Sequence, residues 1–288
     1  SYNDVGLAFL TIYFYHISAI NQWGESPFSN EANATTLNNE TRVGEPVYAA
    51  LASPGEATDI RSIITATAGV QNAQLRYRQS GTFNFTSVVM QVESGDVYLG
   101  EIPAAAVQAP GVEFKISVTD GSSTTTESAL NYLGIILSGG TSNTNAQPTG
   151  NTVSGYRLFS VPLDLDNESP QAFLAANASL GSYDNTRYRW FDVTNTSLRE
   201  YPDVDNVAPG KGFLFITNLP DIRFNSGSGR TISTVERFAI NLPAGWSLIG
   251  NPFNFNIPFD SLSVSAGTFE LWQFAGAWSQ NTSGLEPW

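Results

Sequence analysis

Two short runs of carboxylates are the residues of this 288-residue chain best suited to chemistry. One run holds Asp164, Asp166 and Glu168, and the other holds Asp203 and Asp205. Two carboxylates about 5–10 Å apart can act as acid and base in glycoside hydrolysis, provided that burial separates their pKa values. Loop carboxylates can instead bind Ca²⁺ through about six to eight oxygens, although neither run has EF-hand spacing. Both runs are polar and loop-like, so we expect mainly solvated carboxylates, and Ca²⁺ is the one cofactor considered.

Tryptophan offers a second kind of site, because exposed coplanar aromatic rings can stack on sugars. The candidates for a carbohydrate platform are Trp190, Trp272 and Trp278. The alternative is core packing, since Trp246 and Trp272 occupy positions that recur in an internal repeat. Large aromatic side chains at such positions commonly form the core.

Asn-x-Ser/Thr sequons mark a third kind of site, for covalent glycans. The candidate acceptors are Asn33, Asn39, Asn84, Asn167, Asn177, Asn195 and Asn281. Such triplets also arise by chance in a chain this rich in Asn, Ser and Thr. They therefore indicate a modification only if the source organism glycosylates its proteins.

The composition excludes several classes of protein. The chain has no Cys and a single His, so disulfides, thiol catalysis and a multi-His zinc site within one chain are excluded. A Ser-His-Asp triad would need His16, which lies mid-strand and should point to solvent. The net charge of −13, with lysine only at Lys115 and Lys211, argues against nucleic acid as a partner. The longest apolar stretch, residues 5–20, is too short and polar to be inserted in a membrane.

Short alternating runs separated by Gly, Pro, Asn and Asp must position these side chains, and they predict an all-β fold. Residues 74–78 and 113–118 alternate apolar and polar side chains, so each strand should present one face to a core. One helix is expected, beginning at Ser169-Pro170 and ending at Gly181. Residues 225–230 are expected to form a hairpin turn.

Polar composition marks the boundaries between modules. Residues 138–152 have almost no apolar side chains and predict a linker, and residues 35–46 form a weaker boundary. Beyond the linker lies an internal repeat with copies at residues 155–216 and 245–288. In the first copy an apolar strand follows Pro209-Gly210-Lys211-Gly212, whereas the second copy ends before its counterpart. We therefore expect the last module to be incomplete.

Residues 1–36 resemble the closing strands of a fibronectin type III domain. The resemblance rests on residues 13–21, Gly24-Glu25-Ser26 and Ser29-Asn30-Glu31. It implies that Tyr13 is a tyrosine-corner residue and that Tyr15, Ile17 and Ala19 face a core. The earlier strands of such a domain are absent, so we expect this module to be incomplete. Because two free strands are unstable alone, they belong to a longer chain or complete a sheet in a neighbouring subunit.

The other two modules resemble parts of secreted bacterial proteins. Residues 46–132 resemble an immunoglobulin-like sandwich, and residues 153–288 resemble a β-rich module near the C-terminal ends of large secreted or surface proteins. The first resemblance rests on Leu75-Arg76-Tyr77-Arg78, Val89-Met90, Tyr98, Ile102-Pro103-Ala104 and Gly111-Val112-Glu113-Phe114. The second rests on Gly181-Ser182-Tyr183-Asp184, Pro209-Gly210-Lys211-Gly212-Phe213 and Gly245-Trp246-Ser247-Leu248-Ile249-Gly250-Asn251-Pro252-Phe253. Such modules imply spacing or adhesion and carry no established chemistry.

These features predict tandem β-sandwich modules in a non-catalytic structural or adhesion segment of a large secreted or cell-surface bacterial protein. A subunit of an extracellular filament or sheath is one form of this function. The expected partners are other copies of the chain, other surface proteins or glycans. The alternative is an accessory carbohydrate-binding region of a secreted hydrolase. An enzyme in its own right would need a deep pocket holding two buried carboxylates.

Overall fold

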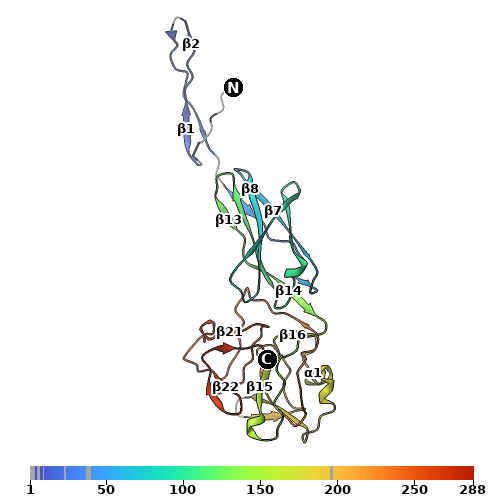
Figure 1. The fold of residues 1–288 in the computed structure, drawn as a ribbon. Helices are drawn as coiled ribbons and strands as arrows, with labels where there is room; N and C mark the ends of the chain where they lie inside the picture. Colours follow the sequence, from blue (N-terminus) through green and yellow to red (C-terminus); the bar gives the residue numbers. More distant parts are fainter. Residues whose placement is uncertain (1–3, 5–6, 9, 23, 37–39, 195–196) are drawn as a thin grey trace.

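The computed structural model describes the whole chain except residues 1–3, 5–6, 9, 23, 37–39 and 195–196. Its described part is mostly β-structure in antiparallel sheets, so the all-β prediction is confirmed. An N-terminal ribbon, a central sandwich and a C-terminal module follow one another along the molecule (Figure 1). None of the helices among the described residues is long and apolar enough to cross a membrane.

The N-terminal ribbon projects away from the rest of the molecule (Figure 1). It consists of β1 (Ile12–Tyr15) paired antiparallel with β4 (Ala32–Thr35), and β2 (Ile20–Asn21) paired with β3 (Gly24–Glu25). Ile17 is 75% exposed, and Ala19 is exposed as well. The expectation that these side chains face a core is therefore wrong in this structure, because no second sheet covers the ribbon within the described residues.

The central sandwich consists of two antiparallel sheets. The first has the order β10 (Gln91–Ser94), β11 (Val97–Ile102), β7 (Thr58–Ala66) and β5 (Thr41–Val43). The second contains β9 (Thr86–Val89), β8 (Val70–Gln79), β12 (Val112–Asp120) and β14 (Asn131–Leu137). The smaller elements are β13 (Thr125–Glu127) on β12, β6 (Leu51–Ala52) parallel to β14, and the 3₁₀ turn η1 (Ala104–Ala106).

Alternation along the central strands explains this core. In β12 the side chains of Phe114, Ile116 and Val118 are completely buried, and in β8 Leu75 is buried with them. Apolar residues at every second position lie on one face of a strand, so they meet the opposite sheet together. The runs that predict strands at residues 74–78 and 113–118 therefore lie within β8 and β12.

The C-terminal module has one well-formed sheet and several short pairs. The sheet has the order β15 (Arg157–Ser160), β19 (Gly212–Thr217), β17 (Tyr188–Thr194) and β18 (Ser197–Glu200). The short strands are β16 (Asp164–Leu165), β20 (Gly229–Arg230), β21 (Ile257–Pro258), β22 (Trp272–Phe274), β23 (Trp278–Gln280) and β24 (Gly284–Leu285). The helical turns are α1 (Pro170–Ala176), η2 (Val153–Gly155), η3 (Ala178–Leu180) and η4 (Phe259–Ser261).

The helix α1 begins where its capping residues predict. The Ser169 side chain accepts a hydrogen bond from the Ala172 backbone N–H at 3.2 Å, and Pro170 occupies the first turn. These features satisfy one of the free N–H groups at a helix start. The α-helix ends at Ala176, η3 continues to Leu180, and Gly181 leaves the turn with a φ of 65°.

The strand β14 joins the sandwich to the C-terminal module. Its first residues pair with β12, and its last two pair with β20 in the register Ile136↔Arg230 and Leu137↔Gly229. One sheet therefore runs from β9 through β8, β12 and β14 to β20 and β16. Residues 225–230 do not form the expected hairpin turn. Instead they lead into β20, which pairs with β14 on one side and with β16 on the other.

The segment 138–152, marked by its sequence as a linker, is hydrogen-bonded to the C-terminal module. Asn143 exchanges two bonds with Phe224, since its backbone N–H donates to the Phe224 carbonyl at 3.2 Å and its Oδ1 accepts from the Phe224 N–H at 2.7 Å. The N–H groups of Gln147 and Gly150 donate to the carbonyls of Ile222 and Thr217. Backbone groups along this segment, together with the buried Asn143 side chain, thus pair with the module.

Candidate functional sites

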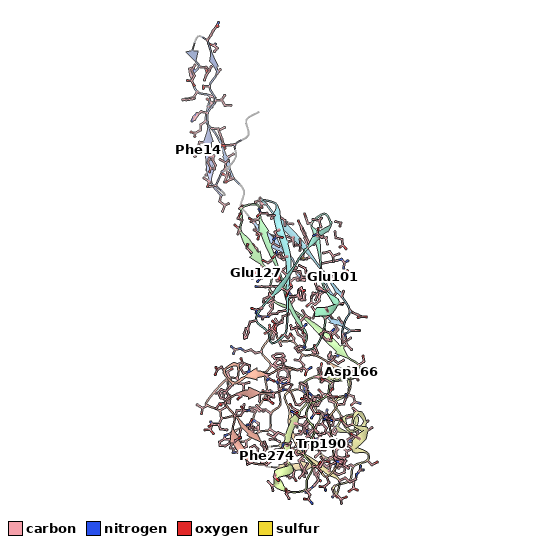
Figure 2. The ribbon with its side chains drawn as sticks, viewed as in Figure 1. Phe14, Glu101, Glu127, Asp166, Trp190 and Phe274 are labelled. Carbon is pink, nitrogen blue, oxygen red and sulfur yellow. The ribbon has the colours of Figure 1, made fainter. Side chains whose placement is uncertain are left out.

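The five carboxylates that suggest acid–base chemistry or Ca²⁺ binding do not converge. Asp164, on β16, forms an ion pair with Arg230 of β20 at 2.6 Å. Asp166 lies exposed near the joint between the sandwich and the module (Figure 2), and Asp203 is also exposed. The described residues contain no group of three or more His, Cys, Asp or Glu side chains that could hold a metal ion. Arginine, lysine or solvent therefore takes the place that a bound cation would have.

An ionic cluster around one buried carboxylate lies in the first copy of the repeat. Asp192 on β17 is completely buried. It receives two hydrogen bonds, at 3.0 and 2.7 Å, from Arg199, which lies opposite it on β18. Arg199 also lies 2.5 Å from Asp205, and Lys211 contacts both carboxylates. The Asp205 backbone N–H donates to Asp192 at 2.6 Å. Each carboxylate is thus neutralised by a cation, which is a structural arrangement.

Hydrogen bonding sets the protonation of this cluster. The bond from Arg199, followed by the bond from Lys211, lowers the pKa of Asp205 below its ordinary value of 3.8. The same contacts with Asp205 and Asp192 raise the pKa of Arg199. An acid for catalysis would need a raised carboxyl pKa. Asp205 is shifted in the opposite direction, so it is a poor general acid.

The three tryptophans expected to form a carbohydrate platform lie in different environments. Trp190 is completely buried and stacks on Tyr201 at 5.7 Å, with Phe173 and Phe213 also in contact. It therefore cannot contact a sugar, and the prediction that Trp190 belongs to a carbohydrate platform is wrong. Burial follows from its position on β17, where alternation directs it into the aromatic core of the module.

The other two tryptophans remain accessible, and each is tilted against a neighbouring aromatic ring. Trp278 is 53% exposed and meets Phe274 edge to face at 5.0 Å, with 64° between the rings. Trp272 is half-buried, its indole N–H donates to Glu270 at 3.1 Å, and its ring lies at 70° to that of Trp246. Figure 2 places Phe274 in the C-terminal module, apart from Trp190. Neither ring is therefore coplanar with the aromatic neighbour that it contacts.

The described sequons differ in the accessibility of their asparagines. Asn33 and Asn84 are exposed. Asn177 is buried, and its amide donates to the carbonyls of Phe173 and Asn225 at 2.7 and 2.8 Å, so it cannot carry a glycan in the folded chain. The side-chain oxygens of Asn167 and Asn281 accept backbone hydrogen bonds in turns. Asn39 and Asn195 lie outside the described residues.

Buried carboxylates elsewhere are also paired. Glu113 forms an ion pair with Arg78 at 2.6 Å and accepts a hydrogen bond from Thr234 at 2.6 Å. Asp120 accepts hydrogen bonds from the backbone of Ser122 and Thr124. Each carboxylate is held by fixed donors, which matches a structural role better than proton transfer.

Two of the hollows in the described part of the chain were compared with the needs of an enzyme, and neither is lined by a buried carboxylate. The larger has a volume of about 480 Å³ and lies at the joint, where Tyr132, Asp164 and Arg230 line it. The other, of about 430 Å³, is lined by Glu40, Arg42 and other residues of the sandwich. Neither has the pair of buried carboxylates that an acid–base enzyme would need.

Comparison with known proteins does not add a function. Neither a scan against protein-family models nor a search of curated proteins found a match to this chain. The assignment of function therefore depends on the geometry described above.

The ionic cluster and the joint are the features that sequence patterns missed. Lysine is scarce in this chain, and Lys211 is one of two lysines. This scarcity is the sequence feature that could have indicated a specific ion-pair partner for Lys211. No sequence signal places Thr231 against Tyr132, because 99 residues separate them.

Proposed function

We propose that this chain is a non-catalytic structural segment of a large secreted or cell-surface bacterial protein, acting as a spacer or adhesion element. The observation that supports this most is the single sheet that passes through β14 from the sandwich into the C-terminal module. A spacer must transmit orientation and force between modules. Strand pairing across the joint does so better than a flexible linker, whose ends move independently.

Side chains at the joint reinforce the strand pairing. The Thr231 hydroxyl accepts hydrogen bonds from the Tyr132 hydroxyl at 2.7 Å and from the Ile135 backbone N–H at 2.8 Å. Burial raises the pKa of Tyr132 to about 12, so this hydroxyl keeps its proton at any physiological pH. Thr234 adds its bond to Glu113 in the sandwich. Groups far apart in the chain thus hold the two modules in one orientation.

The N-terminal ribbon supports contact with neighbouring domains or molecules. The Tyr13 hydroxyl accepts a hydrogen bond from the Ala8 backbone N–H at 2.8 Å, a contact of the kind that a tyrosine corner makes. Phe14 is 58% exposed and Phe28 70% exposed, so both have apolar area left to bury. Assembly into a filament or sheath through this ribbon is part of the proposal, because open strand edges and apolar side chains favour pairing.

Force spectroscopy on the purified chain tests the spacer role. Pulling on residues 41 and 288 should unfold the sandwich and the module together. Thr231→Val should cost about 1–3 kcal/mol and separate the two transitions, because it leaves the buried Ile135 N–H without its acceptor and removes the Tyr132 hydrogen bond across the joint. Thr282→Val, at an exposed position, is the matched control. Independent unfolding of the two modules in the unmodified chain would contradict the proposal.

The extracellular location needs its own test. Antibodies raised against the purified chain should label intact, unpermeabilised cells that express it, or its polymer in the medium. Labelling that requires permeabilisation would place the chain inside the cell and refute this part of the proposal.

Glycan binding is a second candidate, favoured by the exposure of Trp246 at 70% and of Trp278 at 53%. It would make the chain an accessory region of a secreted hydrolase. The tilted rings rank it below the spacer role. Retention on immobilised polysaccharide that Trp278→Ala abolishes would reverse this order.

A further inference from the structure

We propose that the free edge of β9, in the central sandwich, is an interface for a second copy of this chain. Two β9 strands pair antiparallel about a two-fold axis and join the second sheets of two sandwiches into one sheet. This contact goes beyond the spacer role, and it does not involve the N-terminal ribbon. It is built from strands in the middle of the chain, so it does not depend on what precedes or follows the sequence.

β9 is the last strand of its sheet. It pairs antiparallel with β8, from Thr86↔Tyr77 to Val89↔Gln74, and with no other strand among the described residues. Across the sandwich, β10 pairs with β11 rather than with β9. Thr86 and Ser87 point to opposite faces of the strand and both are exposed, and Val89 is 57% exposed. No strand therefore covers the far side of β9 in the described part of the chain.

The ladder with β8 leaves two residues of β9 with outward backbone groups. The Met90 N–H donates to the Ala73 carbonyl at 2.9 Å, so the backbone of Met90 turns towards β8. Hydrogen-bonded and non-hydrogen-bonded pairs alternate along an antiparallel ladder. Val88 therefore also turns towards β8, whereas the N–H and C=O groups of Ser87 and Val89 point to the side where the sheet ends. Such groups are satisfied by water or by another strand.

Other edges of the sandwich carry features that block strand pairing, and β9 does not. β10 has a register shift between Val92 and Ser94, and the charged Glu93 lies within it. β5, at the opposite edge of the first sheet, contains Arg42. Bulges and charges are common means of protecting an edge. By contrast, residues 86–92 read Thr-Ser-Val-Val-Met-Gln-Val, with no charge, Pro or Gly and with three Val that favour strands.

The charge around β9 lets two copies approach each other. The chain has a net charge of −13, so two copies repel each other over much of their surface. Beside β9, three cations surround the ring of Phe85 at 5.5, 4.4 and 5.3 Å from its centre, namely Arg76, Arg78 and Lys115. The acids on this face, Glu113 and Glu127, form ion pairs with these cations. Like-charge repulsion is therefore weak at this edge, which can meet its own counterpart.

A two-fold axis beside Val88 makes the edge complementary to itself. Ser87 of each copy lies opposite Val89 of the other, and the two residues exchange both backbone hydrogen bonds. Val88 lies opposite Val88 of the second copy in a non-hydrogen-bonded pair, with Cα atoms about 4.5 Å apart. Val88 packs against the core of its own sandwich. The two cores thus become continuous at this pair, and one sequence supplies both donors and acceptors.

A single engineered cysteine tests this geometry, because the chain has no Cys. Val88→Cys places two thiols opposite each other, at a Cα separation that a disulfide can span. Mild oxidation of the full chain should then give a cross-linked dimer. Ile63→Cys is the matched control, since that position is 60% exposed on the other sheet and should not cross-link. No cross-linking of Val88→Cys, or equal cross-linking of both variants, overturns the proposal.

Charged substitutions test whether this edge drives association. Sedimentation of the unmodified full chain at up to about 1 mM should show dimers, a range chosen because small interfaces can be weak. Lysine at both positions (Ser87→Lys with Val89→Lys) should abolish the dimer, because like charges then lie opposite each other. Glutamate at both positions should do the same, and mixing the two variants should restore association. Circular dichroism checks that the variants fold.

The sedimentation results have clear contrary outcomes. A monomeric unmodified chain, or dimers that survive in either charged variant, overturns the proposal. A mixture of the two variants that stays monomeric overturns the proposed register.

These outcomes are separate from those of the proposed function. The charged variants leave the joint and residues 1–36 unaltered, so the response to force and any assembly through the ribbon should persist. Assembly that the β9 variants do not affect would refute this interface and leave the role of the ribbon intact. Loss of dimers in these variants, in a chain whose modules unfold independently, would support the interface and refute the spacer role.

Discussion

The two copies of the repeat share their motif residues but differ in how these residues are packed. In the first copy Phe159 is 3% exposed within a four-stranded sheet and an aromatic core. In the second copy the aligned Ile249 is half-buried in a segment that forms no strand. Similar local sequence therefore produces a strand only where a partner strand is present. The comparison illustrates how strongly strand formation depends on tertiary context.

Contact between the copies also depends on small residues. A Cβ on Gly250 would lie 2.1 Å from the Ser160 Cβ, and one on Gly212 would lie 2.6 Å from the Ile249 carbonyl oxygen. Backbone can approach so closely only where a side chain is missing. The glycines of the motif thus allow the two copies to pack against each other.

Replacing the central tryptophan of the first copy should have the largest effect. Trp190→Ala should lower the free energy of unfolding by about 3–5 kcal/mol, because it leaves a large cavity among aromatic side chains. Trp278→Ala in the second copy should cost less than about 1 kcal/mol, since half of that side chain is already in water. Urea denaturation of both variants measures the difference. Equal losses would show that the second copy is as well packed as the first.

Breaking the ionic cluster around Asp192 should have the next largest effect. Asp192→Asn should lower the free energy of unfolding by about 2–3 kcal/mol, because the completely buried Asp192 side chain loses its charge-assisted hydrogen bonds from Arg199. The second copy has Ala275 at the aligned position and no equivalent cluster. Asp166→Asn, at an exposed position, is the control. A loss for Asp192→Asn as small as the control's would mean that the cluster is solvated.

The contact between the copies can be tested through its glycine. Gly250→Ala should cost about 1–3 kcal/mol, because the added Cβ has to displace Ser160. Gly139→Ala provides the matched control, since nothing lies within 4 Å of its Cβ position. Thermal melting of the two variants should therefore differ. Unchanged stability of Gly250→Ala would show that the copies are not packed as described.

The smallest predicted effect is a dependence on pH in the first copy. Because the pKa of Asp205 is lower in the folded chain than its ordinary value of 3.8, its ionised form stabilises the fold above that pH. This contribution is lost as the pH falls through the folded pKa. Asp205→Asn should be less stable than the unmodified chain at pH 7, and the difference should shrink below about pH 4. Acid titrations followed by circular dichroism check this, and a difference that stays constant would contradict it.

Local patterns predicted the elements whose partners are nearby or whose signals are strong. Alternation identified β8 and β12, and Ser169 with Pro170 identified the start of α1. These signals act within a few residues, through the pleat of a strand and the free N–H groups of a helix start.

Features that depend on distant partners were not predictable. Polar residues 138–152 look like a linker because their partners, residues 217–226, lie about 80 positions later in the chain. Trp190 looked like a platform residue because burial is decided by Phe159, Phe173 and Phe213, which come from other elements. The Asp205 carboxylate suggested Ca²⁺ because its cations, Arg199 and Lys211, are brought to it only by folding.

Hydrogen exchange of the unmodified chain, read by mass spectrometry, compares the pairing of the joint and of both repeat copies in one experiment. We predict slow exchange in β14 of the sheet that crosses the joint and in β15 and β19 of the first repeat copy, because these strands are paired in ladders. We predict fast exchange at residues 246–248, which enter no ladder or bridge in the described part of the chain. Equal protection of the two copies, or fast exchange in β14, would contradict these predictions.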